Sequence, residues 1–275
     1  MMNSKKKSAC VLMAFGVFSM LLCFASDSLL AADASAGKIT DKLFGYWRLD
    51  ENSVNSFADA SGNCPKAVPD ELFCQPMMKM IPGKIGNAVA FDGTGDSWGK
   101  GIPVNCKALS GKNDELCMAF WIQPVEWNKD KGADKPAYNR TWDKNEFIRK
   151  GHSILVRINK DDTESSGMMG FSIFKSNTWN LRSETYRLPL KQWTFVVWNF
   201  KAKEGGRLFI NGKAVGSVVG EPGDVIPSDV DEMVIGRSSY NAVLDEFALW
   251  GRVLSEAEIA DLYNDGKGKA IIPAP

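Results

Sequence analysis

The sequence predicts an all-β fold, an antiparallel sandwich of two sheets with one short helix near the C-terminus. Short segments rich in β-branched and aromatic residues recur along the chain, separated by Gly, Asn, Asp or Pro. Only the segment 255–266 carries clear helical signals. A parallel sheet would need a crossover helix for each pair of strands, and the sequence offers no such helices.

Each expected strand is five to nine residues of this composition followed by a turn signal. In chain order the expected strands cover 45–50, 86–93, 117–124, 146–151, 153–160, 170–175, 192–200, 207–212, 213–220, 232–236 and 242–250. Asn211-Gly212 is a strong signal for a two-residue hairpin turn between two of them. Asp161 and Asp162 indicate a second turn.

The helix is predicted from its first residue to its last. Ser255 is a good N-cap, and Glu258 three residues later completes a capping box. Gly266 is expected to end the helix. The apolar residues that share one helical face are Ile259, Leu262 and Tyr263.

The N-terminus has the pattern of a secretory signal. Lys5, Lys6 and Lys7 precede an apolar run at 9–25, and small residues follow. We expect cleavage after Ala32, with cleavage after Ala34 or Ala36 as the second choice, and the alternative to a cleaved signal is a membrane anchor. The sequence therefore predicts a signal peptide (1–32), a linker (33–42), one domain (43–266) and a loosely held tail (267–275). We expect a protein that is secreted, periplasmic or held at the cell surface, with no membrane span after signal removal.

Charge gives no indication of a polyanionic partner. Lys plus Arg number 33 and Asp plus Glu number 33, so the formal net charge is zero. Binding to nucleic acid is not expected from this balance. The mature chain of about 243 residues is a suitable length for one sandwich domain.

The cysteines of the mature chain indicate disulfide bonds, as is usual for an exported protein. They are Cys64, Cys74, Cys106 and Cys117. Four cysteines allow three pairings. We favour Cys64–Cys74 with Cys106–Cys117, because each pair closes a short loop. Zinc is disfavoured, since no C-x-x-C spacing occurs and the chain has 1 histidine, His152.

Four segments resemble the LamG-like jelly-roll domains of the concanavalin A-like lectin/glucanase superfamily, as found in secreted bacterial proteins. They are GYWRLDE (45–51), GKIGNAVAFDGTGD (83–96), CMAFWIQP (117–124) and VLDEFALWGRVLSEAEIADLYNDG (243–266). The resemblance implies two antiparallel sheets packed as a jelly roll. It also implies a binding or accessory module, in many members with one calcium ion.

The same resemblance implies a set of calcium ligands. Asp245 would be the ligand from the closing strand, and Asp50 and the Asp92-Gly93 turn would supply others. Calcium prefers several carboxylate and carbonyl oxygens, which this set offers. The alternative is that Asp50 and Asp92 only shape turns.

Catalysis is not predicted, and we assign no catalytic residue. A retaining glycosidase needs two carboxyl groups about 5–5.5 Å apart. Asp245 and Glu246 are adjacent, and adjacent strand residues are expected to point to opposite faces. The RSETYR stretch (182–187) is faintly similar to a strand of jelly-roll alginate lyases, but the glutamine and histidine of their second motif are not matched.

Aromatic residues in a polar insertion at 126–145 are the candidate ligand contacts: Trp127, Tyr138 and Trp142. Exposed aromatics can stack on sugar rings or anchor a protein. Alternatively they fold over the sandwich as a satellite cluster. We therefore expect a non-catalytic exported recognition module for an extracellular glycan or protein. The alternatives are a polysaccharide hydrolase or lyase, or a structural or adhesive surface protein.

Overall fold

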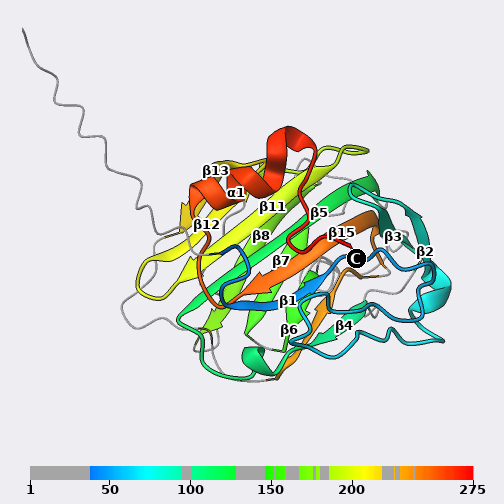
Figure 1. Cartoon of the computed structure of the whole chain (residues 1–275), viewed down its shortest axis with the longest axis horizontal. Helices are drawn as coiled ribbons and strands as arrows, with labels where there is room; N and C mark the ends of the chain where they lie inside the picture. The colour runs from blue at the N-terminus through cyan, green and yellow to red at the C-terminus, as the bar shows by residue number, and fades with distance from the viewer. Residues whose placement is uncertain are drawn as a thin grey trace, which may run out of the picture. The chain divides into compact units, whose positions relative to one another are not determined.

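Two antiparallel sheets pack face to face in the structure, which is a computed structural model (Figure 1). It describes residues 38–94, 101–127, 146–151, 153–158, 167–175, 178–179, 186–218, 226, 230–237 and 239–274. The predicted signal peptide, the first half of the predicted linker (33–37) and the turn at 161–162 lie outside the described residues. Residues 37–275 form one compact unit.

The first sheet has eight strands in the order β13-β12-β11-β5-β15-β3-β2, with β1 also paired to β15. Their bounds are β1 Leu43–Trp47, β2 Met78–Pro82, β3 Asn87–Asp92, β5 Glu115–Glu126, β11 Thr194–Lys201, β12 Gly205–Ile210, β13 Lys213–Val218 and β15 Asn241–Trp250. Asn211 and Gly212 both have positive φ, 51° and 78°, so the predicted hairpin turn between β12 and β13 is confirmed.

The second sheet has seven strands in the order β10-β8-β7-β6-β14-β4, with β9 paired to β8. Their bounds are β4 Ile102–Asn105, β6 Glu146–Lys150, β7 Ile154–Ile158, β8 Met168–Lys175, β9 Thr178–Trp179, β10 Tyr186–Arg187 and β14 Glu232–Ile235. The two-sheet antiparallel sandwich is confirmed. Strand β4 was not predicted; it tolerates Pro103 because it lies at a sheet edge.

The core lies between the sheets and is made by alternate residues of each strand. Phe120 of β5 links the two sheets. Its ring centroid lies 6.2 Å from Phe247 on β15 and 6.3 Å from Phe147 on β6. Trp47 of β1 continues this aromatic row, 6.1 Å from Phe247. Buried aromatic area of this kind is the main stabilising contribution in a sandwich.

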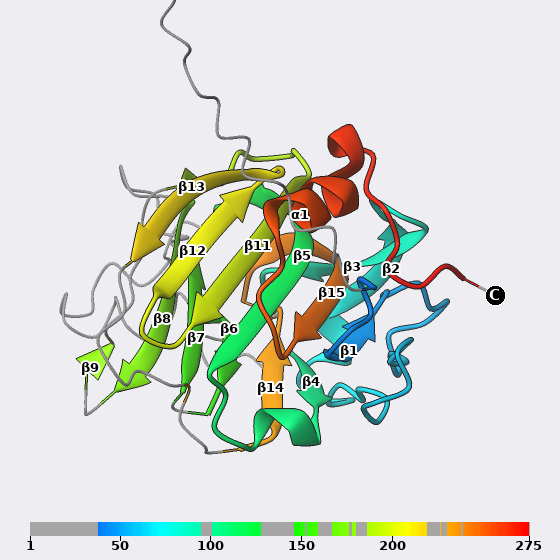
Figure 2. The same cartoon turned by 60° about the vertical axis from the view of Figure 1, so that its left-hand side comes forward.

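Helix α1 (Glu256–Tyr263) lies across the other face of the first sheet, as Figure 2 shows. We call this face the outer face. The capping box of Ser255 and Glu258 is confirmed. Ile259 and Leu262 are buried in an apolar cluster formed between α1 and the outer face. The helix ends at Asn264, which adopts the left-handed conformation at φ 48°, and not at Gly266 as predicted. Within the described part of the chain, no helix has the length and apolarity that crossing a bilayer requires.

The C-terminal tail packs on the outer face, so the expectation of a loosely held tail is wrong. Ile271 and Ile272 contact the apolar cluster beneath α1. Arg48 Nη1 donates to the Ile272 carbonyl at 3.4 Å. Lys269 forms an ion pair with Asp261 of α1 at 2.7 Å. The tail therefore covers part of the first sheet.

The disulfide differs from both predicted pairings, because Cys64 is joined to Cys106. Both sulfurs lie beside the Phe44 carbonyl, since residues 62–83, which we call the 62–83 insertion, fold back against β1. Cys106 faces the core, whereas Cys117 faces the cluster on the outer face. These two side chains are on opposite sides of the first sheet, so a disulfide bond between Cys106 and Cys117 cannot form. Cys74 is buried in the core, with its Sγ 3.3 Å from the Gly101 carbonyl.

Candidate functional site

The adjacent carboxylates of β15, Asp245 and Glu246, lie on the same face of the first sheet. Leu244 before them and Phe247 after them both point into the core. The register with β5 shifts between Asp245 and Ala248, and Glu246 has a φ of 54°. This is a β-bulge, which inserts one extra residue and directs both acids outward. The prediction that the pair points to opposite faces is therefore wrong.

Asp245 holds a turn of the chain at 83–87 against β15. Its Oδ2 accepts hydrogen bonds from the backbone N–H of Lys84 at 2.8 Å and of Ile85 at 3.0 Å. A side chain at Gly83 would not fit, since its Cβ would lie 2.7 Å from Asp245 Oδ2. The side chain is 0% exposed, and Oδ1 has no hydrogen-bond partner among the described residues.

Glu246 is buried beneath the C-terminal tail. Tyr46 of β1 donates its hydroxyl hydrogen to Glu246 Oε2. The residue is 5% exposed, and its Oε1 has no partner among the described residues. Ile271 of the tail and Leu262 of α1 line the same small space as Glu246.

Burial controls the ionisation of both acids. Loss of hydration, together with the neighbouring charges of Glu246 and Asp50, raises the pKa of Asp245 to about 8, although the two N–H groups oppose the rise. Loss of hydration also raises the pKa of Glu246 to about 7, against the hydrogen bond from Tyr46. Burial likewise raises the pKa of the Tyr46 phenol. At neutral pH the pair is therefore partly or fully protonated.

This arrangement does not suit glycoside hydrolysis, although the two acids share a face. Such a reaction needs the carboxyl groups on either side of a sugar bond in an accessible cleft. Asp245 and Glu246 are closed off from solvent by the 83–87 turn and the tail. A sugar chain therefore cannot reach these two carboxyl groups, even though they lie on the same face of the sheet.

The predicted calcium ligands do not form one set. Asp50 and Asp245 both hold the 83–87 turn, since Asp50 Oδ1 accepts from the Asn87 N–H at 2.8 Å. Asp92 lies at a separate, exposed turn, where its Oδ1 accepts from the Thr94 N–H at 2.8 Å. Gly93 belongs to that second turn. Across the described ranges, no three His, Cys, Asp or Glu side chains are grouped to hold a metal ion.

Of the predicted ligand contacts, only Trp127 lies among the described residues. It is half-buried and packs against the core. A Cβ at Gly167 would lie 2.8 Å from its Cζ2, so the indole covers this glycine closely. This position fits the alternative of a satellite cluster. Tyr138, Trp142, His152 and most of the RSETYR stretch lie outside the described residues.

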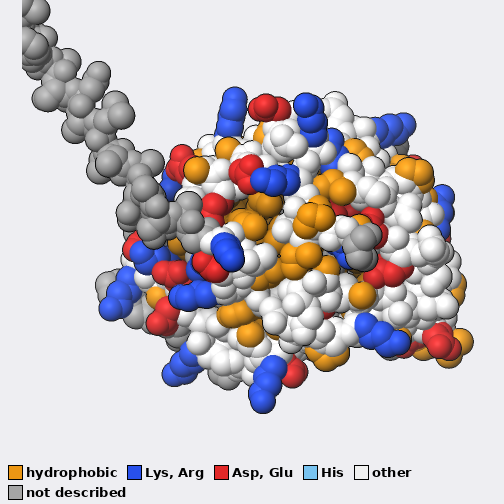
Figure 3. All heavy atoms as spheres, viewed as in Figure 1, with side chains coloured by type: hydrophobic (Ala, Val, Ile, Leu, Met, Phe, Trp, Pro, Cys, Tyr) orange, Lys and Arg blue, Asp and Glu red, His pale blue; other side chains and the backbone are white. Residues whose placement is uncertain are grey.

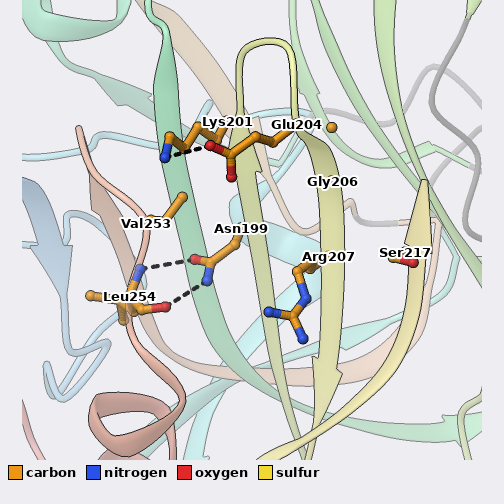
Figure 4. Close-up of a pocket in the computed structure, with 9 residues that line it drawn as sticks. Asn199, Lys201, Glu204, Gly206, Arg207, Ser217, Val253 and Leu254 are labelled. Atoms are coloured by element: carbon orange, nitrogen blue, oxygen red, sulfur yellow. Dashed lines mark hydrogen bonds and ion pairs between the residues drawn. The ribbon is translucent and has the colours of Figure 1, made fainter. Parts of the chain in front are cut away.

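A pocket with both polar and apolar lining opens on the outer face beside α1, and no pattern in the sequence indicates it (Figure 4). Its volume is about 330 Å³. The strand register places Arg207 of β12 between Asn199 on β11 and Ser217 on β13. These three side chains form a row across the outer face. We call this space the Asn199 pocket. Its lining residues are Asn199, Lys201, Glu204, Gly205, Gly206, Arg207, Ser217, Val253 and Leu254.

Paired interactions define the walls of the Asn199 pocket. Asn199 Nδ2 donates to the Leu254 carbonyl at 2.7 Å, and its Oδ1 accepts from the Leu254 N–H at 3.1 Å. Arg207 Nη2 lies 3.0 Å from Glu256 of α1. Figure 4 shows the Lys201–Glu204 ion pair, 2.6 Å long, at the β11–β12 turn. Figure 3 shows charged side chains of both signs around this side of the molecule, with apolar side chains between them.

A family model of the concanavalin A-like lectin/glucanases superfamily matches residues 96–260. The match covers more than half of the chain, and the two-sheet sandwich described above agrees with it. The chain therefore belongs to this superfamily, and the predicted family and jelly-roll fold are confirmed.

Solved structures with the same fold include several binding domains. Domain 4 of an extracellular arabinanase from Geobacillus stearothermophilus, in complex with arabinotriose, has a TM-score of 0.54 at 15% identity, covering 80% of this chain and 97% of that one. The binding domain of Paraclostridial Mosquitocidal Protein 1 has a TM-score of 0.58 at 15% identity, covering 83% and 53%. The binding domain of Botulinum Neurotoxin DC, in complex with SialylT, has a TM-score of 0.58 at 16% identity, covering 82% and 52%.

Curated relatives match only part of the chain. Adhesion G-protein coupled receptor D1 of Homo sapiens is 31% identical over 104 residues, which are 34% of this chain and 11% of the receptor. The receptor of the same name from Bos taurus is 26% identical over 129 residues, 46% of this chain and 13% of the receptor. The matched region is thus a small part of these receptors.

Proposed function

We propose that the chain is an exported, non-catalytic recognition domain that binds an extracellular glycan. The observation that carries the proposal is a solvent-open pocket with polar side chains on a jelly-roll sandwich, whereas the carboxylate pair Asp245 and Glu246, elsewhere on the same sheet, is buried. Solved structures with this fold include complexes with arabinotriose and with SialylT. The disulfide Cys64–Cys106 suits an oxidising, extracellular compartment.

A panel of immobilised neutral and acidic polysaccharides tests this proposal. The chain lacking residues 1–32 is applied to each polysaccharide, and both retention and the release of reducing or unsaturated ends are measured. We expect retention on one class of glycan and no release of product. Failure to be retained on any glycan, or release of sugar ends, would contradict the proposal.

Protein recognition is the second candidate, and one exposed apolar site favours it. Leu72 and Phe73, at the tip of the 62–83 insertion, are 76% and 60% exposed. Exposed apolar side chains that lie together often mark a contact with another protein. Replacing both by serine should abolish capture of a protein partner and leave glycan retention unchanged.

Calcium binding remains a separate proposal, with Asp50 and Asp245 as the carboxylates. The buried, unpartnered Oδ1 of Asp245 supports it, because calcium readily takes up carboxylate oxygens of this kind. Bound calcium would tie β15 to the 83–87 turn more firmly. We expect calcium to raise the melting temperature and Asp245→Asn to remove the increase. An unchanged melting temperature after chelation of the parent protein would refute the proposal.

A further inference from the structure

We propose that the Asn199 pocket is the subsite that takes one neutral sugar unit of the ligand. This inference rests on the proposed glycan-binding function and assigns it to particular residues. The sugar would lie on the outer face of β11, β12 and β13, bordered by the segment that leads into α1. Three properties of the pocket support this assignment: its space, its charge and its rigidity.

The space arises from the strand register. Side chains on the outer face of these strands would normally fill it, but Lys201 is opposite Gly205, which has none. Gly205 has a φ of 97°, which favours glycine at this position. The resulting volume of about 330 Å³ is at the lower end of the range for ligand pockets. It therefore suits a small polar unit and not an extended apolar ligand.

The charges of the pocket are balanced in pairs. Among the lining residues Lys201 is paired with Glu204, and Arg207 is paired with Glu256 of α1, which lies outside the lining. Each cation of the pocket therefore already has a carboxylate partner. An acidic sugar would have to compete with Glu256 for Arg207. A neutral sugar can accept hydrogen bonds from the Arg207 nitrogens that Glu256 does not engage, since a guanidinium has five N–H donors. The exposed Ser217 hydroxyl, on the β13 side of Arg207, can both donate a hydrogen bond to the sugar and accept one from it.

The wall of the pocket is held rigidly before any ligand arrives. Both polar atoms of the Asn199 amide bind the backbone of Leu254, which fixes the segment before α1 against β11. Asn199 is buried, so we assign it as a positioning residue and not as a sugar contact. Rigid walls reduce the entropy lost on binding, which matters for a small ligand with few contacts.

Two variants and two matched controls test the assignment. Ser217→Tyr fills the pocket from β13, and Lys213→Tyr adds the same side chain to the same strand outside the pocket. Arg207→Ala removes the donor, and Arg187→Ala removes an exposed arginine from the second sheet. Each protein is titrated calorimetrically with arabinotriose and other neutral oligosaccharides, and with sialyllactose and oligogalacturonate as acidic probes. Circular dichroism confirms that each variant is folded.

We expect the parent to bind a neutral oligosaccharide. Ser217→Tyr and Arg207→Ala should each weaken this binding at least about tenfold, or about 1.4 kcal/mol, and the controls should bind as the parent does. Equal binding by all five proteins would overturn the pocket assignment and leave the glycan-binding function standing. Binding of acidic probes alone would overturn the predicted ligand class. Absence of any saccharide binding would overturn the proposed function and this inference together.

Discussion

Asp245 and Glu246 are consecutive residues of one strand whose side chains lie on the same face of the sheet, because a bulge at Glu246 interrupts the alternation. Each carboxyl group is held by one partner segment: the 83–87 turn donates to Asp245, and Tyr46 donates to Glu246. The pair therefore ties the closing strand to two earlier parts of the chain. Its role in this account is structural.

The raised pKa of Asp245 predicts a dependence of stability on pH when calcium is removed by a chelator. An unfolded aspartate has a pKa of about 3.9, whereas the pKa in the fold is about 8. Between these values the folded state binds more protons than the unfolded state, so stability falls as pH rises. Glu246, with a pKa of about 7, acts in the same direction.

Urea denaturation from pH 5 to pH 8 measures this effect. We expect the midpoint to decrease across the range in the parent, and the slope to be smaller in Asp245→Asn. Asp92→Asn, at the exposed turn, is the matched control and should keep the slope of the parent. A parent midpoint that stays level across this range, with the same slope in Asp245→Asn, would show that Asp245 is ionised in the fold.

The hydrogen bond from Tyr46 to Glu246 should contribute measurably to stability. Tyr46→Phe leaves both oxygens of a buried carboxyl group without a protein donor, which costs about 1–3 kcal/mol. The control is Tyr186→Phe, at a half-buried tyrosine on β10. Equal free energies of unfolding for Tyr46→Phe and the parent would mean that Glu246 is satisfied in another way.

The Cys64–Cys106 bond makes a prediction for chemical mapping. Digestion without reductant should yield one cross-linked peptide pair that contains these two residues. Cys64→Ser should lower stability by about 2–5 kcal/mol. Cys117 should resist alkylation in the folded protein, because burial raises the pKa of its thiol. Recovery of a Cys64–Cys74 or Cys106–Cys117 peptide would instead support the short-loop pairing.

Local sequence signals predicted the parts of the fold that depend on neighbouring residues. Ser255 and Glu258 define the start of α1, and Asn211-Gly212 defines a hairpin, because capping and turn formation need only a few consecutive residues. The closing segment 243–266 likewise indicated the family. These features required no knowledge of distant contacts.

The remaining features depend on contacts between distant segments. The bulge at Glu246 places a non-glycine residue at positive φ, and the sequence contains no signal for it. The disulfide depends on how the 62–83 insertion folds back to β1. The Asn199 pocket requires the register of β11, β12 and β13 and the position of α1. Sequence periodicity does not determine such relationships.

Recognition of a glycan without catalysis can be tested in one incubation. The chain lacking residues 1–32 is incubated with each polysaccharide that retains it, and reducing and unsaturated ends are counted over time, alongside Glu246→Gln. We expect retention of both proteins and no new ends with either. Release of ends by the parent, lost in Glu246→Gln, would show that the buried pair is catalytic and that the protein is an enzyme.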